Sequence, residues 1–223
     1  MKRVTALLLA AMMIITTGLI APAMAAEDDV PETYSNAYVV MDAKTGQVLL
    51  QKNMYEKEYP ASITKILTTA LGLTYAKPED RITVSQETVS DIWKWGETTH
   101  LALEPGEIIT LKDALYGAMV ESANDCANAI AQAVSGSLTD FAELMNQQVA
   151  ALGLSDTHFT NAHGLPDKDH YTTAYDMARI TRWAMTVPGF EEYFCATEYI
   201  IPKTNKKDVA RNIGTHHHML VES

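Results

Sequence analysis

A serine and a lysine stand three residues apart in an apolar segment, PASITKILTTAL, which covers residues 60–71. On a helix, Ser62 and Lys65 would share one face, with their Cβ atoms about 5–6 Å apart. A serine hydroxyl becomes an effective nucleophile when a base takes its proton. A lysine can be that base if burial among apolar neighbours lowers its pKa. Taken alone, the pair is more simply interpreted as a helix cap at Ser62 and a lysine that reaches solvent.

A second polar group lies farther along the chain, in the segment Glu121–Asp125 at a break between two helical patterns. Ser, Asn and Asp are common helix caps, and this is the simpler interpretation of the segment alone. Beside a serine–lysine pair, however, Ser122 offers a hydroxyl that can relay a proton to a leaving group. Asn124 offers an amide that can hold substrate and lysine. The order and spacing of the two segments favour the catalytic interpretation.

The elements that must position these residues are mostly helices. The apolar residues of 62–76 cover much of the helix circumference, which is typical of a central, buried helix, and Pro78 ends it. A second pattern runs from Thr110 to the break at residues 121–125 and resumes as far as Gly136. Two more helices are expected over residues 139–152 and 173–186.

Strand patterns are few and lie towards the two ends of the chain. Residues 37–41 and 47–51 predict a hairpin around a turn at 42–46, and residues 198–201 predict a later strand. Residues 79–110 are mixed and rich in turns, with one short strand expected at 81–84. We therefore expect a mixed α and β domain whose end strands pair with each other in one antiparallel sheet.

The ordered segments resemble the low-molecular-mass penicillin-binding serine D-Ala-D-Ala carboxypeptidases, whose motifs are S-x-x-K, an S-D-N-like triplet and K-T-G. The likeness is carried by residues 37–46, 60–65, 121–125, 161–166 and 170–178. It implies an α/β fold of the α+β type, like that of the β-lactamases and DD-peptidases. In that fold a five-stranded antiparallel sheet is flanked by helices, with a mostly helical cluster beside it.

The resemblance also implies roles for the four polar residues. Ser62 would attack the bond between two D-alanines, Lys65 would take its proton, Ser122 would relay a proton, and Asn124 would bind substrate. The implied enzyme is exported to the cell envelope and removes the terminal D-Ala from peptidoglycan pentapeptide stems. It is inhibited by β-lactam antibiotics and needs no metal or organic cofactor.

Two alternatives remain beside the carboxypeptidase. A serine β-lactamase of the same fold would need a glutamate on a loop after the second motif. Residues 153–166 contain Asp156 but no glutamate, and Glu143 comes too early in a helical pattern. The other alternative is a catalytically inactive protein that binds the cell wall or senses penicillin; the intact serine–lysine and Ser–Asn motifs argue against it for the whole gene.

The third motif is missing from its expected place, because no Lys-Thr-Gly follows Asn124. Lys44–Gly46 has the right letters but precedes the nucleophile and closes the predicted hairpin. Lys203–Asn205 lacks the glycine that would let substrate approach a strand. We therefore expect residues 26–223 to be a catalytic domain that stops before its C-terminal strands, and the 223-residue chain alone to be inactive.

Residues 1–25 have the pattern of a secretory signal peptide. Lys2 and Arg3 precede an apolar run, and Ala23–Ala25 has the small-x-small form of a cleavage site. A retained membrane anchor is the alternative, because the apolar run approaches the length of a membrane span. The sequence thus predicts an exported protein, with peripheral membrane association left open for a segment beyond Ser223.

The charge balance and the number of cysteines each argue against one class of protein. The chain has 17 Lys and Arg against 28 Asp and Glu, a net charge of −11, which argues against binding to nucleic acid. Its two cysteines, Cys126 and Cys195, exclude a disulfide framework. Export makes a bridge between them possible, but we expect two buried thiols.

The remaining conspicuous residues are interpreted as structural. Three consecutive histidines, His216–His218, do not converge on one metal ion without further ligands. His163 belongs to a structural loop in the family resemblance, and serine–lysine chemistry needs no histidine. Trp93, Trp95 and Trp183 are expected to pack in the protein rather than to bind sugars.

Overall fold

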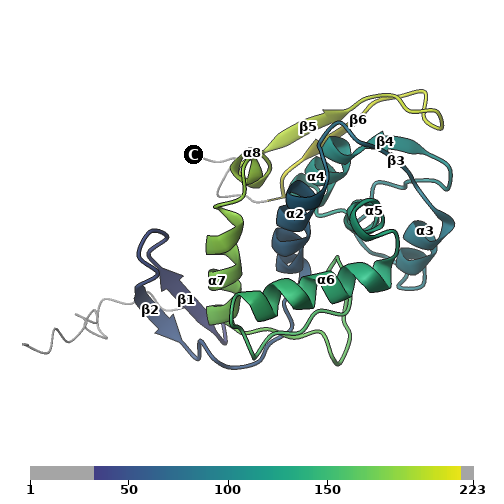
Figure 1. Ribbon diagram of the computed structural model, residues 1–223. Helices are drawn as coiled ribbons and strands as arrows, with labels where there is room; N and C mark the ends of the chain where they lie inside the picture. The colour runs from purple at the N-terminus through teal and green to yellow at the C-terminus, as the bar shows by residue number, and fades with distance from the viewer. Residues whose placement is uncertain (1–32, 217–223) are drawn as a thin grey trace, which may run out of the picture. The chain divides into compact units, whose positions relative to one another are not determined.

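The computed structural model describes residues 33–216 (Figure 1). The predicted signal peptide, residues 1–25, lies outside this range, as do His217 and His218. The helices are α2 (Thr64–Tyr75), α3 (Gln86–Trp93), α4 (Leu111–Val120), α5 (Asn124–Ser135), α6 (Leu138–Ala151), α7 (Ala174–Ala184) and α8 (Phe190–Phe194). The strands are β1 (Tyr38–Met41), β2 (Val48–Lys52), β3 (Arg81–Thr83), β4 (Ile108–Thr110), β5 (Glu198–Ile201) and β6 (Arg211–Gly214).

Helix α2 is the buried centre of the helical cluster, and it contacts α4, α5 and α7 (Figure 1). Its apolar residues Leu67 and Leu71 are fully buried, which confirms the prediction of a central helix. Gly72 explains how closely the helices approach, because a Cβ atom there would lie 2.9 Å from Ile130 on α5. The segment that carries Ser62 and Lys65 therefore leads into a helix that neighbouring helices hold on several sides.

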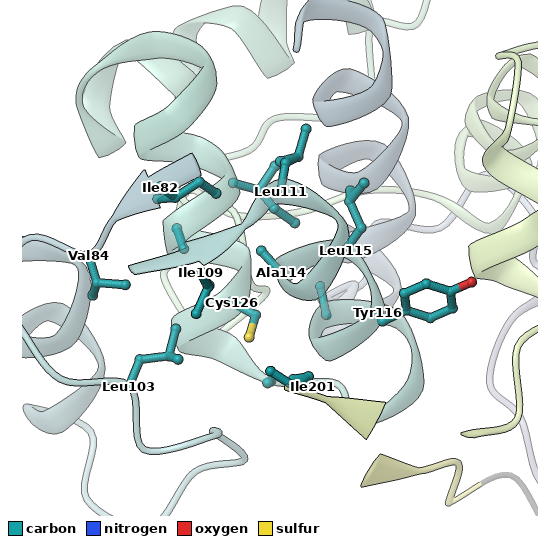
Figure 2. Close-up of a cluster of buried hydrophobic side chains, with 14 of the residues drawn as sticks. Ile82, Val84, Leu103, Ile109, Leu111, Ala114, Leu115, Tyr116, Cys126 and Ile201 are labelled. Carbon is teal, nitrogen blue, oxygen red and sulfur yellow. The ribbon is translucent and has the colours of Figure 1, made fainter. Parts of the chain in front are cut away.

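A second apolar cluster joins α4 and α5 to the short strands around them, as Figure 2 shows. Leu111 and Leu115 of α4 are fully buried, and Cys126 of α5 packs in the same cluster with Ile201 of β5. Burying one such leucine contributes about 1.5–3 kcal/mol. This cluster fixes the α4–α5 junction, which carries the second polar motif.

The described strands form three separate antiparallel pairs, β1–β2, β3–β4 and β5–β6. The prediction that strands from both ends of the chain pair in one sheet is therefore wrong for residues 33–216. The two end pairs pack on different helices. Arg182 of α7 donates hydrogen bonds of 2.8 Å to the carbonyls of Ala43 and Lys44 beside β1, whereas Tyr199 of β5 stacks on Tyr116 of α4 with ring centroids 3.9 Å apart.

The region that the sequence analysis described as turn-rich contains helix α3 and the β3–β4 pair. The start of α3 carries a cap that the sequence analysis missed, since Ser85 accepts a hydrogen bond of 3.1 Å from the backbone N–H of Thr88. Helix α8 and strand β6 were also missed. The other helices and the N-terminal hairpin lie within two residues of their predicted bounds.

Three side chains lie in surroundings other than those expected. Cys126 and Cys195 are both free thiols, as predicted, but only Cys126 is buried and Cys195 is exposed. Trp93 and Trp95 are also exposed rather than packed, by 57% and 41%. Both lie at the end of α3, where the chain leaves the helix for a surface loop. Trp183 packs against the core, as expected.

Within residues 33–216, none of the helices combines the length and the apolar character that crossing a membrane requires.

Candidate active site

Ser62 and Lys65 lie where the chain enters α2. Ser62 is exposed in a short 3-10 turn, Ala61–Ile63, and Lys65 lies in the first turn of the helix with only 2% of its surface exposed. Neither the turn nor the helix has a side-chain cap. The interpretation of Ser62 as a cap and of Lys65 as a surface lysine is therefore wrong. Their placement instead presents a serine hydroxyl to solvent above a buried amine.

The Lys65 amine has four oxygen neighbours, and their distances fall into two groups. The Nζ atom donates short hydrogen bonds to Asn124 Oδ1, at 2.7 Å, and to the backbone carbonyl of His163, at 2.9 Å. The hydroxyls of Ser62 and Ser122 lie farther away, at 3.3 and 3.4 Å. The structure thus brings all four predicted site residues together around a single nitrogen.

This arrangement suits a neutral amine. A neutral lysine has two N–H groups and one lone pair, and the two near oxygens can only accept hydrogen bonds. Both N–H groups are therefore occupied by Asn124 and His163, which leaves the lone pair for the serine hydroxyls. A hydroxyl can donate its proton to that lone pair, as general-base chemistry requires.

Electrostatics favour the same protonation state. Burial lowers the pKa of Lys65 to about 7, against the opposing effect of Asp125 on α5. Cys126 also faces Lys65, but burial raises the pKa of this thiol well above its usual range, so the thiol stays neutral. A substantial fraction of the lysine is therefore uncharged near neutral pH.

The junction between α4 and α5 supplies the second motif. Ser122 adopts a left-handed conformation, with φ of +58°, which is strained for a residue with a side chain. The buried Asn124 opens α5 and donates its backbone N–H to the carbonyl of Thr99, at 2.9 Å. Asp125 accepts hydrogen bonds from the backbone N–H groups of Leu101 and Leu103, at 3.0 Å each. These bonds hold the loop beside the motif in place.

Residues 161–166 form the other wall of the site, and they contact it through their backbone. His163 contributes its carbonyl rather than its ring to Lys65. Gly164, at φ of +89°, packs so closely on the turn that carries Ser62 that a Cβ atom would lie 1.8 Å from the carbonyl oxygen of Ala61. This loop was predicted to be structural, and neither contact was predicted. The glycine was the only signal available, because backbone carbonyls have no residue-type signature.

A buried histidine, His170, contacts the start of α2 next to Ser62. The backbone N–H of Thr160 donates to His170 Nδ1 at 3.0 Å, so the other ring nitrogen carries the proton and donates to the Thr64 hydroxyl at 3.0 Å. Burial lowers the pKa of His170 to about 4. The imidazole therefore stays neutral at physiological pH and acts as a fixed support for the start of α2.

A cavity of about 300 Å³ lies over the Ser62 hydroxyl. Its wall includes Asn124, Gly164 and the exposed ring of Tyr59, together with residues 97–99. Among the described residues, Glu97 provides the carboxylate on this wall. Glu97 was not predicted as a site residue, because a carboxylate in a turn-rich segment resembles any solvated surface residue.

Within residues 33–216, no three side chains of His, Cys, Asp or Glu gather closely enough to hold a metal ion. The first residue of the histidine run, His216, is exposed and lies 3.1 Å from the Glu121 carboxylate.

Comparison with known proteins identifies the family. Residues 23–217 match the family model of the D-alanyl-D-alanine carboxypeptidases. The chain belongs to this family. The D-alanyl-D-alanine carboxypeptidase DacF of Bacillus subtilis is 34% identical over 218 residues, which are 93% of this chain and 54% of that protein. DacC of Escherichia coli is 37% identical over 173 residues, 72% of this chain and 42% of that protein.

The fold agrees with this membership. The crystal structure of penicillin binding protein 6B from Escherichia coli superimposes with a TM-score of 0.77 at 26% identity, covering 88% of this chain and 62% of that one. The predicted fold class is thereby confirmed. The chain spans about half the length of the D-alanyl-D-alanine carboxypeptidases that it matches.

Proposed function

We propose that the protein is an exported serine-type D-Ala-D-Ala carboxypeptidase. It would remove the terminal D-Ala from peptidoglycan pentapeptide stems outside the cytoplasm and would be acylated by penicillin. The observation that carries the proposal is the buried Lys65 amine, whose N–H groups are taken by Asn124 and His163 while its lone pair faces two serine hydroxyls. The family relatives, which are D-alanyl-D-alanine carboxypeptidases, support the choice of substrate.

In the proposed acylation, Ser62 Oγ attacks the carbonyl carbon between the two D-alanines as Lys65 takes its proton. The start of α2 places partial positive charge beside the oxygen that becomes negative. Lys65 then returns the proton through the Ser122 hydroxyl to the departing amine, so that D-Ala leaves and the rest of the stem stays bound as an ester. A water molecule hydrolyses the ester and restores the Ser62 hydroxyl. Asn124 holds both the lysine and the substrate during these steps.

A serine β-lactamase is the nearer alternative, and the surroundings of Asp156 argue against it. Asp156 is the only acidic residue between residues 153 and 166, and this segment contains no glutamate. Its side chain is 52% exposed and pairs with Lys57 at 3.5 Å on the surface. Asp156 is not among the residues that line the cavity beside Ser62. A catalytically inactive protein remains the other alternative, and the first experiment distinguishes it.

We expect penicillin to form one covalent adduct with the full-length protein, on the peptide that carries Ser62. The β-lactam amide imitates the D-Ala-D-Ala bond, so Ser62 should open it in the same way. Mass spectrometry after penicillin treatment should show this adduct in the wild type and in the control Ser155→Ala, which changes an exposed serine. Ser62→Ala should show none. An adduct on another serine, or no adduct in the wild type, contradicts the proposal.

The acylation rate should rise with pH through about 7, because only the neutral form of Lys65 can take the Ser62 proton. Below that pH the rate should fall about tenfold per pH unit as the amine becomes protonated. His170, with a pKa of about 4, stays neutral across this range and does not contribute. Stopped-flow measurement of penicillin acylation from pH 5 to 9 tests this. A flat profile would exclude Lys65 as the base.

A further inference from the structure

A buried histidine and a carboxylate from α3 lie directly behind the loop that contacts Lys65. The ring of His163 is 2% exposed, and its Nε2 atom lies 3.0 Å from Asp91 Oδ2. Asp91 also accepts hydrogen bonds from Lys94 and Asn128. The chemistry described above uses neither of these two side chains, although one backbone atom of His163 belongs to the site.

The hydrogen bonds determine which ring nitrogen carries the proton. The backbone N–H of Leu165 donates to His163 Nδ1 at 3.1 Å, so Nδ1 is the acceptor. The proton therefore lies on Nε2, which donates to Asp91. Both ring nitrogens are held, and the ring cannot turn without breaking one of these bonds.

The backbone on either side of His163 is held as well. Asn161 Oδ1 accepts hydrogen bonds from the backbone N–H groups of His163, at 3.2 Å, and Gly164, at 2.7 Å. The turn is thus fixed by Asn161 at its start and by the His163 ring at its centre. The turn contacts Lys65 through the His163 carbonyl, which accepts a hydrogen bond from Lys65 Nζ at 2.9 Å.

We infer that Asp91 is a positioning residue for Lys65: it anchors the His163 ring, and the anchored ring keeps the His163 carbonyl in place as an acceptor for the lysine amine. The inference rests on the proposed role of Lys65 as base. It places part of the catalytic apparatus on α3, a helix that does not touch the reacting atoms.

The pair acts through geometry rather than by titrating. Burial alone would raise the pKa of Asp91, but the hydrogen bonds from His163, Lys94 and Asn128 outweigh it and lower that pKa well below its usual range. Burial lowers the pKa of His163, against the opposing effect of Asp91, so the imidazole stays neutral; Lys65 and Lys94 add to this.

Losing the anchor should change Lys65 in two ways. An ammonium gains more from a carbonyl acceptor than a neutral amine does, so the pKa of Lys65 should fall when the His163 carbonyl moves away. The charged groups that face Lys65 from α5, chiefly Asp125, are unchanged by this. The neutral amine should also lose its orientation towards the Ser62 hydroxyl, and acylation should slow.

The test compares three variants in the full-length protein. Asp91→Ala removes the acceptor for His163, whereas Asp91→Asn keeps one oxygen acceptor for His163 and removes the charge and the second carboxylate oxygen, which Lys94 contacts. Glu87→Ala is the matched control, because Glu87 is an exposed carboxylate on the same helix. The first readout is the titration of the Lys65 side chain followed by NMR at its Cε and Nζ atoms. The second is the rate of penicillin acylation as a function of pH.

For Asp91→Ala we expect the Lys65 titration midpoint to fall by about half to one pH unit. Its acylation rate on the alkaline plateau should fall about 10-fold to 100-fold, and the acid limb of the profile should move with the midpoint. Asp91→Asn and Glu87→Ala should keep the wild-type midpoint and stay within about threefold in rate. A loss of stability alone would not move the midpoint.

An unchanged Lys65 midpoint and rate in Asp91→Ala would overturn the inference, as would equal effects in the alanine and asparagine variants. If Asp91→Ala does not fold, His163→Phe provides the second test, because it keeps an aromatic ring and removes both ring hydrogen bonds. The NMR titration does not depend on penicillin. A wild type that titrates as expected but is not acylated would therefore contradict the proposed function and leave the positioning role to be judged on the titration.

Discussion

Replacing Lys65 by arginine should abolish acylation of Ser62 by penicillin, even though the positive charge is kept. A guanidinium stays protonated at any accessible pH and cannot take the serine proton. General-base catalysis is typically worth about 10²–10⁴ in rate, and we expect a loss in this range. The measurement is the rate of penicillin acylation on the alkaline plateau of the wild-type profile, where the lysine is neutral.

Two further variants make the result specific. Lys168→Arg is the matched control, because Lys168 has an 87% exposed side chain and should keep the wild-type rate. Lys65→Met keeps the approximate length of the side chain but removes the amine, and so separates loss of the base from crowding by the larger guanidinium. Equal losses in Lys65→Arg and Lys65→Met support the base. A loss below tenfold in either variant would show that another group takes the proton.

Replacing Gly164 by alanine should both destabilise the fold and displace the nucleophile. The new Cβ atom would lie 1.8 Å from the carbonyl oxygen of Ala61 and 2.4 Å from its carbon, so the backbone on one side must move. The φ of +89° adds strain for any residue with a side chain. Together, overlap and strain should cost about 3–5 kcal/mol. A shift of about 1 Å in the Ser62 turn should slow acylation about 100-fold.

The chain contains a close control for this change. Gly189 has a φ of +84°, yet a Cβ atom there would meet no atom within 4 Å. Gly189→Ala therefore has the same conformational strain without the overlap, and should cost about 1–2 kcal/mol with no change in acylation. Thermal unfolding and acylation measured side by side test the pair. Similar stability in both variants would mean that the contact between Gly164 and Ala61 is looser than described.

The chemistry of the site was largely predictable from residue types and spacing. A serine and lysine at i and i+3, followed by a serine and asparagine at a helix break, are local features that survive in any fold containing those helices. The apolar residues around most of the circumference of residues 62–76 also predicted that this helix is buried. The structure places Ser62, Lys65, Ser122 and Asn124 together as those patterns predicted.

The sheet was not predictable in the same way. Residues 38–41 and 198–201 were correctly predicted as strands, because β-branched and aromatic residues favour extended backbone. Their partners depend on which surfaces the helices leave open. In the described residues, Arg182 holds the first pair at α7 and Tyr116 holds the last pair at α4. A strand's own sequence carries little information about which distant strand or helix it will contact.

The sequence by itself determined which hydroxyl, amine and amide side chains are available for the proposed chemistry and which helical segments lie beside them, because functional groups and apolar periodicity follow directly from residue types. Only the tertiary structure decided the rest of the Lys65 environment. The acceptor at His163 is a backbone carbonyl, which every residue has. Asp91 contacts the ring of the same histidine from a helix in a segment without a clear pattern. Such contacts follow from how distant segments pack, and no local pattern in the sequence records them.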